Sequence, residues 1–261
     1  MRIRFSGQTD VGRKRQHNED AFLVAEDYQL ALVCDGMGGH NCGEVASSIA
    51  VDEVRDFFKE TQNDRDFTWP FKEEKGLKWD ENRLVTGVKL ANQRILDEGE
   101  ADKSKKGMGT TLVAALFKTN SISVAHVGDS RCYRFRDGKM ELLTEDHSLL
   151  NEFIRRRKPN EAEIARFPHK NVICRALGLG RKVIVDVNRI EGLPGDLLML
   201  CSDGLNGMIT DAEILDVAKP FLEECAAEKK GQLDALCEAF IDAANEGGGK
   251  DNITCICVQV L

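Results

Sequence analysis

The 261-residue sequence contains no apolar run approaching the roughly 18 residues of a membrane-spanning helix. Its first ten residues include two arginines but lack the apolar stretch of a secretory signal peptide. Only 5 residues are proline and 23 are glycine, which excludes collagen-like and proline-rich chains. We therefore expect the protein to stay in the cytoplasm, where it is made.

The sequence also lacks paired cysteine motifs and an excess of basic residues. The nine cysteines include no C-x-x-C pair, and most lie in apolar runs, as Cys201 does. This pattern predicts reduced cysteines in the core and gives no support to a zinc site or a thioredoxin-type motif. The 44 acidic residues outnumber the 36 basic ones, for a net charge of −8, which disfavours a nucleic-acid-binding protein.

Hydrophobic residues make up 42% of the chain and charged residues 31%, as is usual for a globular protein. Apolar runs and periodicity predict strands at 22–24, 30–34, 110–117, 122–127, 132–136, 140–143, 183–185, 197–201 and 253–260, and helices at 45–58, 84–95, 211–222 and 233–244. The stretch 147–175 is expected to be rich in loops. Because strands and helices come in blocks and no linker divides them, we expect a single α+β domain with mostly antiparallel strands.

Acidic residues recur where the predicted strands meet turns. Asp35, Asp129 and Asp203 follow apolar runs, Asp251 precedes the last run, and the pair Glu19–Asp20 precedes another. Several carboxylates at neighbouring strand ends repel one another unless cations lie between them. Ligation by oxygen alone favours Mg²⁺ or Mn²⁺ over zinc or copper. The pattern therefore indicates a site for two metal ions, although each Asp-Gly pair taken singly also fits ordinary turn chemistry.

Eight motifs follow one another along nearly the whole chain. They run from Thr9 to Asp20 (T-D-V-G-x-x-R-x-x-N-E-D), Val33 to His40 (V-C-D-G-M-G-G-H), Met108 to Thr111, Val127 to Arg131, Glu145 to Ser148, Arg175 to Gly178, Cys201 to Leu205 and Asp251 to Thr254. In this order and spacing they resemble the metal-dependent protein phosphatases, the type 2C Ser/Thr phosphatases, in their compact bacterial form. The resemblance implies an antiparallel β-sandwich flanked by helix pairs, in four layers (αββα). Residues 1–261 would form one catalytic domain, with a flap within 147–178.

The resemblance also implies roles for individual residues. Asp35 would bridge two Mn²⁺ or Mg²⁺ ions, the Gly36 carbonyl would bind one of them, and Asp203 and Asp251 would bind the other. Glu19 and Asp20 would hold metal-bound waters or complete the ligand shell. Asp129, with Asp203, matches a third and weaker metal position. Arg15 matches the arginine that binds the substrate phosphate, since a guanidinium bonds two phosphate oxygens in a planar fork.

One residue departs from the pattern of many eukaryotic relatives, which carry a histidine directly after the Asp-Gly as the proposed general acid. Met37 stands there in this sequence, and its side chain donates no proton. His40, three residues on, is the substitute candidate for a catalytic residue. The alternative is that His40 only packs near the site while a metal-bound water donates the proton.

The expected function is hydrolysis of phosphoserine and phosphothreonine on cytosolic proteins by a water activated between two metal ions. The enzyme would oppose Ser/Thr kinases as a monomer that binds neither nucleic acid nor membranes. A phosphatase for one regulatory phosphoprotein, such as an anti-anti-sigma factor, stays open, as does a hydrolase of nucleotides or other small phosphoesters. A catalytically inactive binding module is disfavoured because the metal ligands and Arg15 are all present.

Two further segments have alternative interpretations. The basic residues at 155–158, with Arg166 and His169–Lys170, either attract phosphopeptides to the flap or form a solvated helix face. The apolar loop at 69–71 docks either on the body of the protein or on a partner, and docking on the body is favoured.

Overall fold

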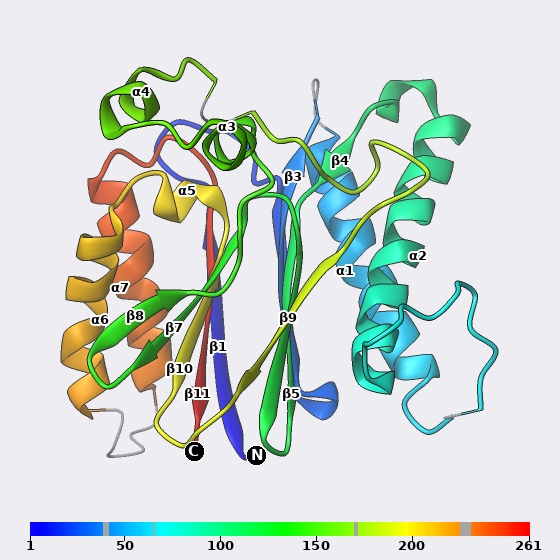
Figure 1. Cartoon of the computed structure of the whole chain (residues 1–261), viewed down its shortest axis with the longest axis horizontal. Coiled ribbons are helices and arrows are strands. Elements are labelled where there is room, and N and C mark those ends of the chain that lie inside the picture. Colours follow the sequence, from blue (N-terminus) through cyan, green and yellow to red (C-terminus); the bar gives the residue numbers. More distant parts are fainter. Residues whose placement is uncertain (39–41, 65, 170–171, 225–230) are drawn as a thin grey trace.

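A computed structural model of the chain describes residues 1–38, 42–64, 66–169, 172–224 and 231–261. In these residues the strands form two antiparallel sheets that face each other (Figure 1). One sheet has the order β1 (Ile3–Asp10), β11 (Ile253–Val260), β10 (Leu197–Cys201), β7 (Arg131–Arg136) and β8 (Lys139–Leu142). The other has the order β2 (Asp20–Ala25), β3 (Leu30–Met37), β5 (Leu112–Lys118), β6 (Ser121–Val127) and β9 (Asp186–Glu191), and β4 (Gly109–Thr110) pairs with the end of β3.

Two pairs of helices cover the outer faces of the sheets (Figure 1). The pair α1 (Gly43–Glu60) and α2 (Trp79–Ala101) packs on the sheet that contains β3, and the pair α6 (Asp211–Glu224) and α7 (Gln232–Glu246) packs on the sheet that contains β1. A third apolar cluster fills the space between the sheets. Three cores between four layers confirm the predicted αββα sandwich.

Local sequence explains the buried strands and the covering helices. Every residue of β11 is buried, which is why this strand is almost continuously apolar instead of alternating. In α1 the buried residues Ala46, Ala50, Val54 and Phe57 recur at helical spacing, so one face of the helix reaches the core. Within the described residues, every helix is too short or too polar to span a bilayer.

Three sequence predictions were wrong. Strand β1 was not predicted, because its apolar and polar residues alternate only weakly. The stretch 147–175 contains two short helices, α3 (Leu149–Arg157) and α4 (Glu161–Arg166), whose caps Ser148 and Asn160 accept hydrogen bonds from backbone N–H groups. The apolar run 183–185 is not a strand, because the β6–β9 ladder ends at the pair His126 and Asp186.

The predictions for the cysteines and for the loop at 69–71 were correct. All cysteines in the described residues are free, and only Cys174 among them is exposed. Trp69 packs on the body of the protein, with ring centroids 4.5 Å from Phe67 and 6.1 Å from Trp79.

Candidate metal centre

The predicted acidic residues meet at one edge of the sandwich, at the upper ends of the strands in Figure 1. Asp20 begins β2 and lies directly opposite Asp35 in β3. Asp203 follows β10 and opens the short helix α5 (Asp203–Asn206), while Asp251 stands just before β11. Asp129 lies in the turn after β6. The antiparallel order of the strands therefore assembles carboxylates that are up to 231 positions apart, as Asp20 and Asp251 are.

Two glycines in the motifs are required by close backbone contacts at this edge. A Cβ atom on Gly36 would lie 2.2 Å from the carbonyl oxygen of Gly43 and 2.4 Å from that of Glu19. A Cβ atom on Gly204 would lie 1.9 Å from the carbonyl oxygen of Asn252. The glycine after Asp35 and the glycine after Asp203 thus allow neighbouring segments to pack against the acidic residues.

Glu19 is held in place through its backbone. Its N–H donates to Oδ1 of Asn252 at 2.8 Å, and its carbonyl oxygen accepts from Gly36 N–H at 3.1 Å and from the Ser47 hydroxyl at 2.6 Å. A Cβ atom on Gly43 would lie 2.8 Å from the Glu19 carboxyl carbon, so this carboxyl lies against the first turn of α1. The positive end of the helix dipole favours a negative charge there.

The carboxylates are crowded enough to shift their pKa values upward. Burial and then the charges of Asp20, Asp203, Asp129 and Asp251 raise the pKa of Asp35 well above its ordinary value. Burial raises the pKa of Asp20 to about 7, although hydrogen bonds from the hydroxyls of Thr254 (2.6 Å) and Ser202 (2.7 Å) oppose the shift.

The same pattern extends to Asp129 and Asp203. Burial, followed by the charge of Asp203, raises the pKa of Asp129 to about 7. For Asp203, burial and then the charge of Asp251 raise the pKa, while a side-chain hydrogen bond to Asp35 partly offsets them. Each carboxylate therefore lies in the field of the others.

Among the described residues, arginine neutralises the group of acidic residues on one side only. The Arg15 guanidinium donates to Oδ2 of Asp251 at 2.8 Å and lies 3.8 Å from Oε2 of Glu19. The guanidinium of Arg131, two positions from Asp129, instead donates two hydrogen bonds of 2.9 and 2.7 Å to the carboxylate of Asp146. Oδ1 of Asp129 is buried and has no hydrogen-bond partner among the described residues. An oxygen-only donor set with an unpartnered buried oxygen and mutually repelling carboxylates fits hard divalent cations.

The profile of the family described as Protein phosphatase 2C matches residues 9–238. The chain belongs to this family. It is 37% identical over 255 residues to the serine/threonine phosphatase stp of Listeria welshimeri, covering 97% of this chain and 94% of that protein. It is also 32% identical to the protein phosphatase PhpP of Streptococcus pneumoniae, covering 97% of this chain and 95% of the relative.

Solved structures of type 2C phosphatases agree with the fold. The catalytic domain of the serine/threonine protein phosphatase PstP, in complex with two manganese ions, superimposes with a TM-score of 0.78 at 30% identity over 99% of this chain and 98% of that one. The serine/threonine phosphatase of S. agalactiae gives a TM-score of 0.81 at 33% identity, with both chains fully covered. The protein is thus a type 2C serine/threonine protein phosphatase, a hydrolase of a family that depends on manganese or magnesium.

Among the predicted site residues, those in described segments lie together. They are Arg15, Glu19, Asp20, Asp35, Gly36, Asp129, Asp203 and Asp251. His40 lies outside the described residues, as does Lys170 of the basic stretch. In that stretch, Arg155 and Arg156 both pair with Glu152, so α3 neutralises part of its own charge, as a solvated helix face does.

Sequence reasoning missed a second polar cluster in this type 2C phosphatase. His126, His147 and Asp186 each have a side-chain atom that could bind a metal ion, and these three atoms all lie within 4.8 Å of one another. Nδ1 of His147 accepts from Gly128 N–H at 3.0 Å, so the ring proton is on Nε2, which lies 3.2 Å from Asp186. Arg175 donates to the other oxygen of Asp186 at 3.0 Å. His147 donates to Asp186 and Arg175 donates to Asp186, so these three residues link the flap region to the turn that carries Asp129, whereas the buried Nδ1 of His126 has no hydrogen-bond partner among the described residues.

Proposed function

We propose that the acidic edge is the catalytic centre of this phosphatase. Asp35, the Gly36 carbonyl, Asp203 and Asp251 would hold two Mn²⁺ or Mg²⁺ ions, and Glu19 and Asp20 would complete the shell. Asp129, with Asp203, would hold a third, weaker ion. The observation that carries this proposal is the convergence of Asp20, Asp129, Asp203 and Asp251 on the buried Asp35, with Asp20 directly opposite it in the sheet; divalent cations would remove the repulsion that raises the pKa of Asp35.

When bound, the two ions supply charge neutralisation for the phosphate and a water acidic enough to attack it at neutral pH. The residues of the chain place and tune this chemistry. The carboxylates of β3 and β2 are fixed by the sheet, so they would hold the reacting groups with little reorganisation. Hydroxyls of Ser202 and Thr254 keep one oxygen of Asp20 oriented.

Arg15 would bind the phosphate group of the substrate. Its side chain is 47% exposed and already spans Asp251 and Glu19, which places a planar fork of donors at the rim of the centre. Neutralisation of Asp251 by a ligand would free this guanidinium for phosphate oxygens. His40 is the candidate donor of the proton to the leaving alcohol, and a metal-bound water is the alternative donor.

The substrates would be cytosolic proteins phosphorylated on serine or threonine by Ser/Thr kinases. The named functions of the relatives in Listeria and Streptococcus support this class. We further propose that the enzyme acts as a monomer in the cytoplasm, without nucleic acid or a membrane.

Phosphate release from a phosphothreonine peptide tests the proposal. We expect activity when Mn²⁺ is added to metal-free protein, loss of activity with EDTA, and recovery with excess Mn²⁺. Full activity in EDTA would contradict a metal centre. Folded protein that binds Mn²⁺ in calorimetry but releases no phosphate from any phosphopeptide would contradict the proposed substrate class.

Replacement of Arg15 tests the phosphate site. Arg15→Ala removes a charge-assisted fork, so KM for the peptide should rise about tenfold with a smaller change in kcat. Arg13→Ala is the matched control, because the Nε of Arg13 donates to the carbonyl oxygen of Asn245 and not to the acidic group. An unchanged KM in Arg15→Ala would remove Arg15 from the phosphate site.

A further inference from the structure

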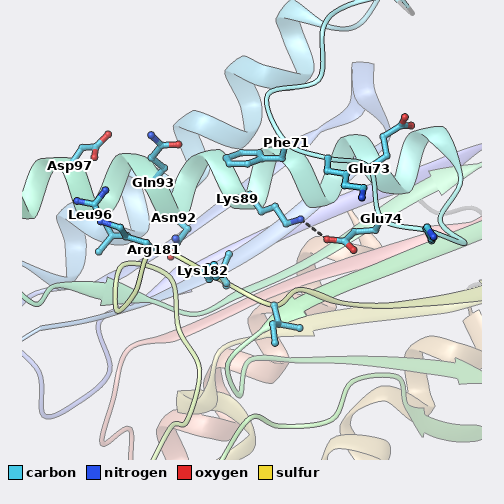
Figure 2. A pocket seen from close by; sticks show the side chains of 14 residues that line it. Phe71, Glu73, Glu74, Lys89, Asn92, Gln93, Leu96, Asp97, Arg181 and Lys182 are labelled. Carbon is cyan, nitrogen blue, oxygen red and sulfur yellow. Dashed lines mark hydrogen bonds and ion pairs between the residues drawn. The ribbon is translucent and has the colours of Figure 1, made fainter.

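A cavity of about 830 Å³ lies on the outer side of α2, apart from the acidic centre (Figure 2). Its walls are one face of α2 from 89 to 97, the loop 71–75, and the segment 181–184, which we call the strap. This volume is within the range of about 300–1,000 Å³ in which proteins bind ligands. None of the predicted catalytic residues lines it. We call this cavity the side groove.

One wall of the side groove is made of apolar side chains, of which Ile184 is exposed and the others are half-buried. Phe71, Leu96, Val183 and Ile184 line it. Ile184 is 67% exposed, and Leu179, just before the strap, is 55% exposed, the two highest values among the large hydrophobic side chains of the described residues. Two such side chains within six residues indicate a surface that binds something apolar.

Cations accompany this apolar wall. Lys72, Lys75 and Lys182 line the side groove and make no ion pair with any described residue, whereas Lys89 pairs with Glu74 at 2.6 Å. Figure 2 shows Lys89 and Lys182 between α2 and the strap, while the carboxylates of Asp97 and Glu73 point away from the strap. In a chain with a net charge of −8, this local excess of unpaired lysines favours an acidic ligand.

The segment 177–180, directly before the strap, connects the side groove to the catalytic edge. Leu177 and Thr110 exchange two backbone hydrogen bonds of 3.1 and 2.9 Å, and the Thr110 hydroxyl donates to the carbonyl oxygen of Asp35 at 2.9 Å. Farther along, the Asn92 side chain in α2 accepts from Gly178 N–H and donates to the Gly180 carbonyl, both at 2.9 Å. The eight residues from Leu177 to Ile184 are joined by seven steps and reach at most about 25 Å, so a peptide of about eight extended residues covers the same path.

We propose that the side groove binds an acidic and apolar segment of the phosphoprotein substrate, at least about eight residues away from the phosphorylated serine or threonine. This docking rests on the proposed function, because it concerns the same substrate. An apolar side chain of the segment packs on Leu96 and Ile184, and flanking carboxylates pair with Lys182 and the lysines of the loop. Docking raises the affinity for the substrate and leaves the chemistry at the acidic edge unchanged.

Binding of a fluorescent hexapeptide without phosphate tests the side groove directly. A peptide that alternates acidic and apolar residues should bind at least tenfold more tightly than the same peptide with lysines in place of the acids. Lys182→Glu and Ile184→Asp should each weaken its binding at least tenfold. The matched controls Lys139→Glu and Leu193→Asp change exposed residues on β8 and in the β9–β10 turn, and they should bind normally. Equal binding of both peptides, or none, would overturn the proposal.

Kinetics then separates docking from catalysis. A phosphothreonine peptide joined through eight flexible residues to the acidic segment should show a KM about tenfold lower than the peptide without it. Ile184→Asp should abolish that advantage, while hydrolysis of p-nitrophenyl phosphate stays unchanged in every variant. An advantage that survives in Ile184→Asp contradicts docking. If sedimentation shows a dimer that Lys182→Glu or Ile184→Asp dissociates, the side groove binds a second copy of the chain and not the substrate. If the unaltered protein does not hydrolyse p-nitrophenyl phosphate, that result counts against the proposed function and not against docking in the side groove.

Discussion

Asp35 and Glu81 are both carboxylates that burial pushes toward the protonated form, yet their pKa values move in opposite directions. At Glu81, the opposing effect of hydrogen bonds from Arg189, the backbone of Lys78 and Ser123 is larger, and the pKa is lowered. At Asp35, the neighbouring charges are aspartates, and the pKa stays well above its ordinary value. Glu81 is thus neutralised within the chain, whereas the proposed metal ligands around Asp35 would be neutralised by bound divalent cations.

Asp186 belongs with Glu81 in this comparison. Burial alone would raise its pKa, but the hydrogen bond from His147 and the charge of Arg175 lower it. Asp186, like Glu81, is thus paired with an arginine of the chain itself. Within the described residues no arginine forms an ion pair with Asp20, Asp35 or Asp129, and among the proposed metal-binding aspartates Asp251 pairs with Arg15.

The largest expected effect comes from removing a charge at the acidic edge. Asp203→Asn should lower kcat/KM by roughly 10²–10³-fold or more and weaken Mn²⁺ binding in calorimetry, because a proposed ligand is lost. In EDTA the variant should melt at or above the temperature of the unaltered protein, since one repelling charge is gone.

Asp216→Asn is the control for Asp203→Asn. This exposed carboxylate of α6 pairs with Lys219, so its loss should change neither activity nor metal binding. Near-normal turnover in Asp203→Asn would contradict the assignment of Asp203 as a metal ligand.

The reverse pattern is expected at Glu81. Glu81→Gln leaves Arg189 without its charged partner and should lower the melting temperature by about 5 °C, with kcat within twofold of normal. Glu141→Gln breaks the exposed pair with Arg134 and should shift the melting temperature by less than about 2 °C. A loss of activity without a loss of stability in Glu81→Gln would reverse the comparison between the two carboxylates.

The smallest effect concerns pH. Asp20 and Asp129 have pKa values of about 7 in the folded chain against an ordinary value of 3.8, so the folded state binds more protons than the unfolded state between about pH 4 and 7. Stability without metal should therefore fall as the pH rises through this window. We expect the melting temperature in EDTA to be about 3 °C higher at pH 5.5 than at pH 7.5. The Mn²⁺-loaded protein should lack this trend. A rise in stability with pH in EDTA would contradict the raised pKa values.

The sequence predicted those parts of the fold whose signals are local. The apolar run of β10 and the helical spacing in α1 are visible without tertiary contacts. Strand β1 lacks such a signal, because its Gly7 and polar residues pair with β11 only after the chain ends are brought together. The apolar run Val183–Val185 was predicted to be a strand, but it lies beyond Asp186, where the pairing of β9 with β6 ends.

Much of the candidate site was predictable because its residues carry fixed motifs at strand ends. The hydrogen-bonded link from Arg175 through Asp186 and His147 to Gly128 could not be predicted from the sequence. It depends on how the flap region packs against β6 and β9. The side groove could not be predicted from the sequence either, because its walls come from three segments separated by up to about a hundred residues.

Both ends of the chain lie at the opposite end of the sandwich from the acidic edge, where Ile3 pairs with Val260 (Figure 1). Joining the two ends by a short linker and opening a new start at the 136–139 hairpin would therefore give a circular permutant with the acidic edge undisturbed. Attachment of either end to a surface would leave the acidic edge facing outward, which suits assays of phosphoproteins with the immobilised protein.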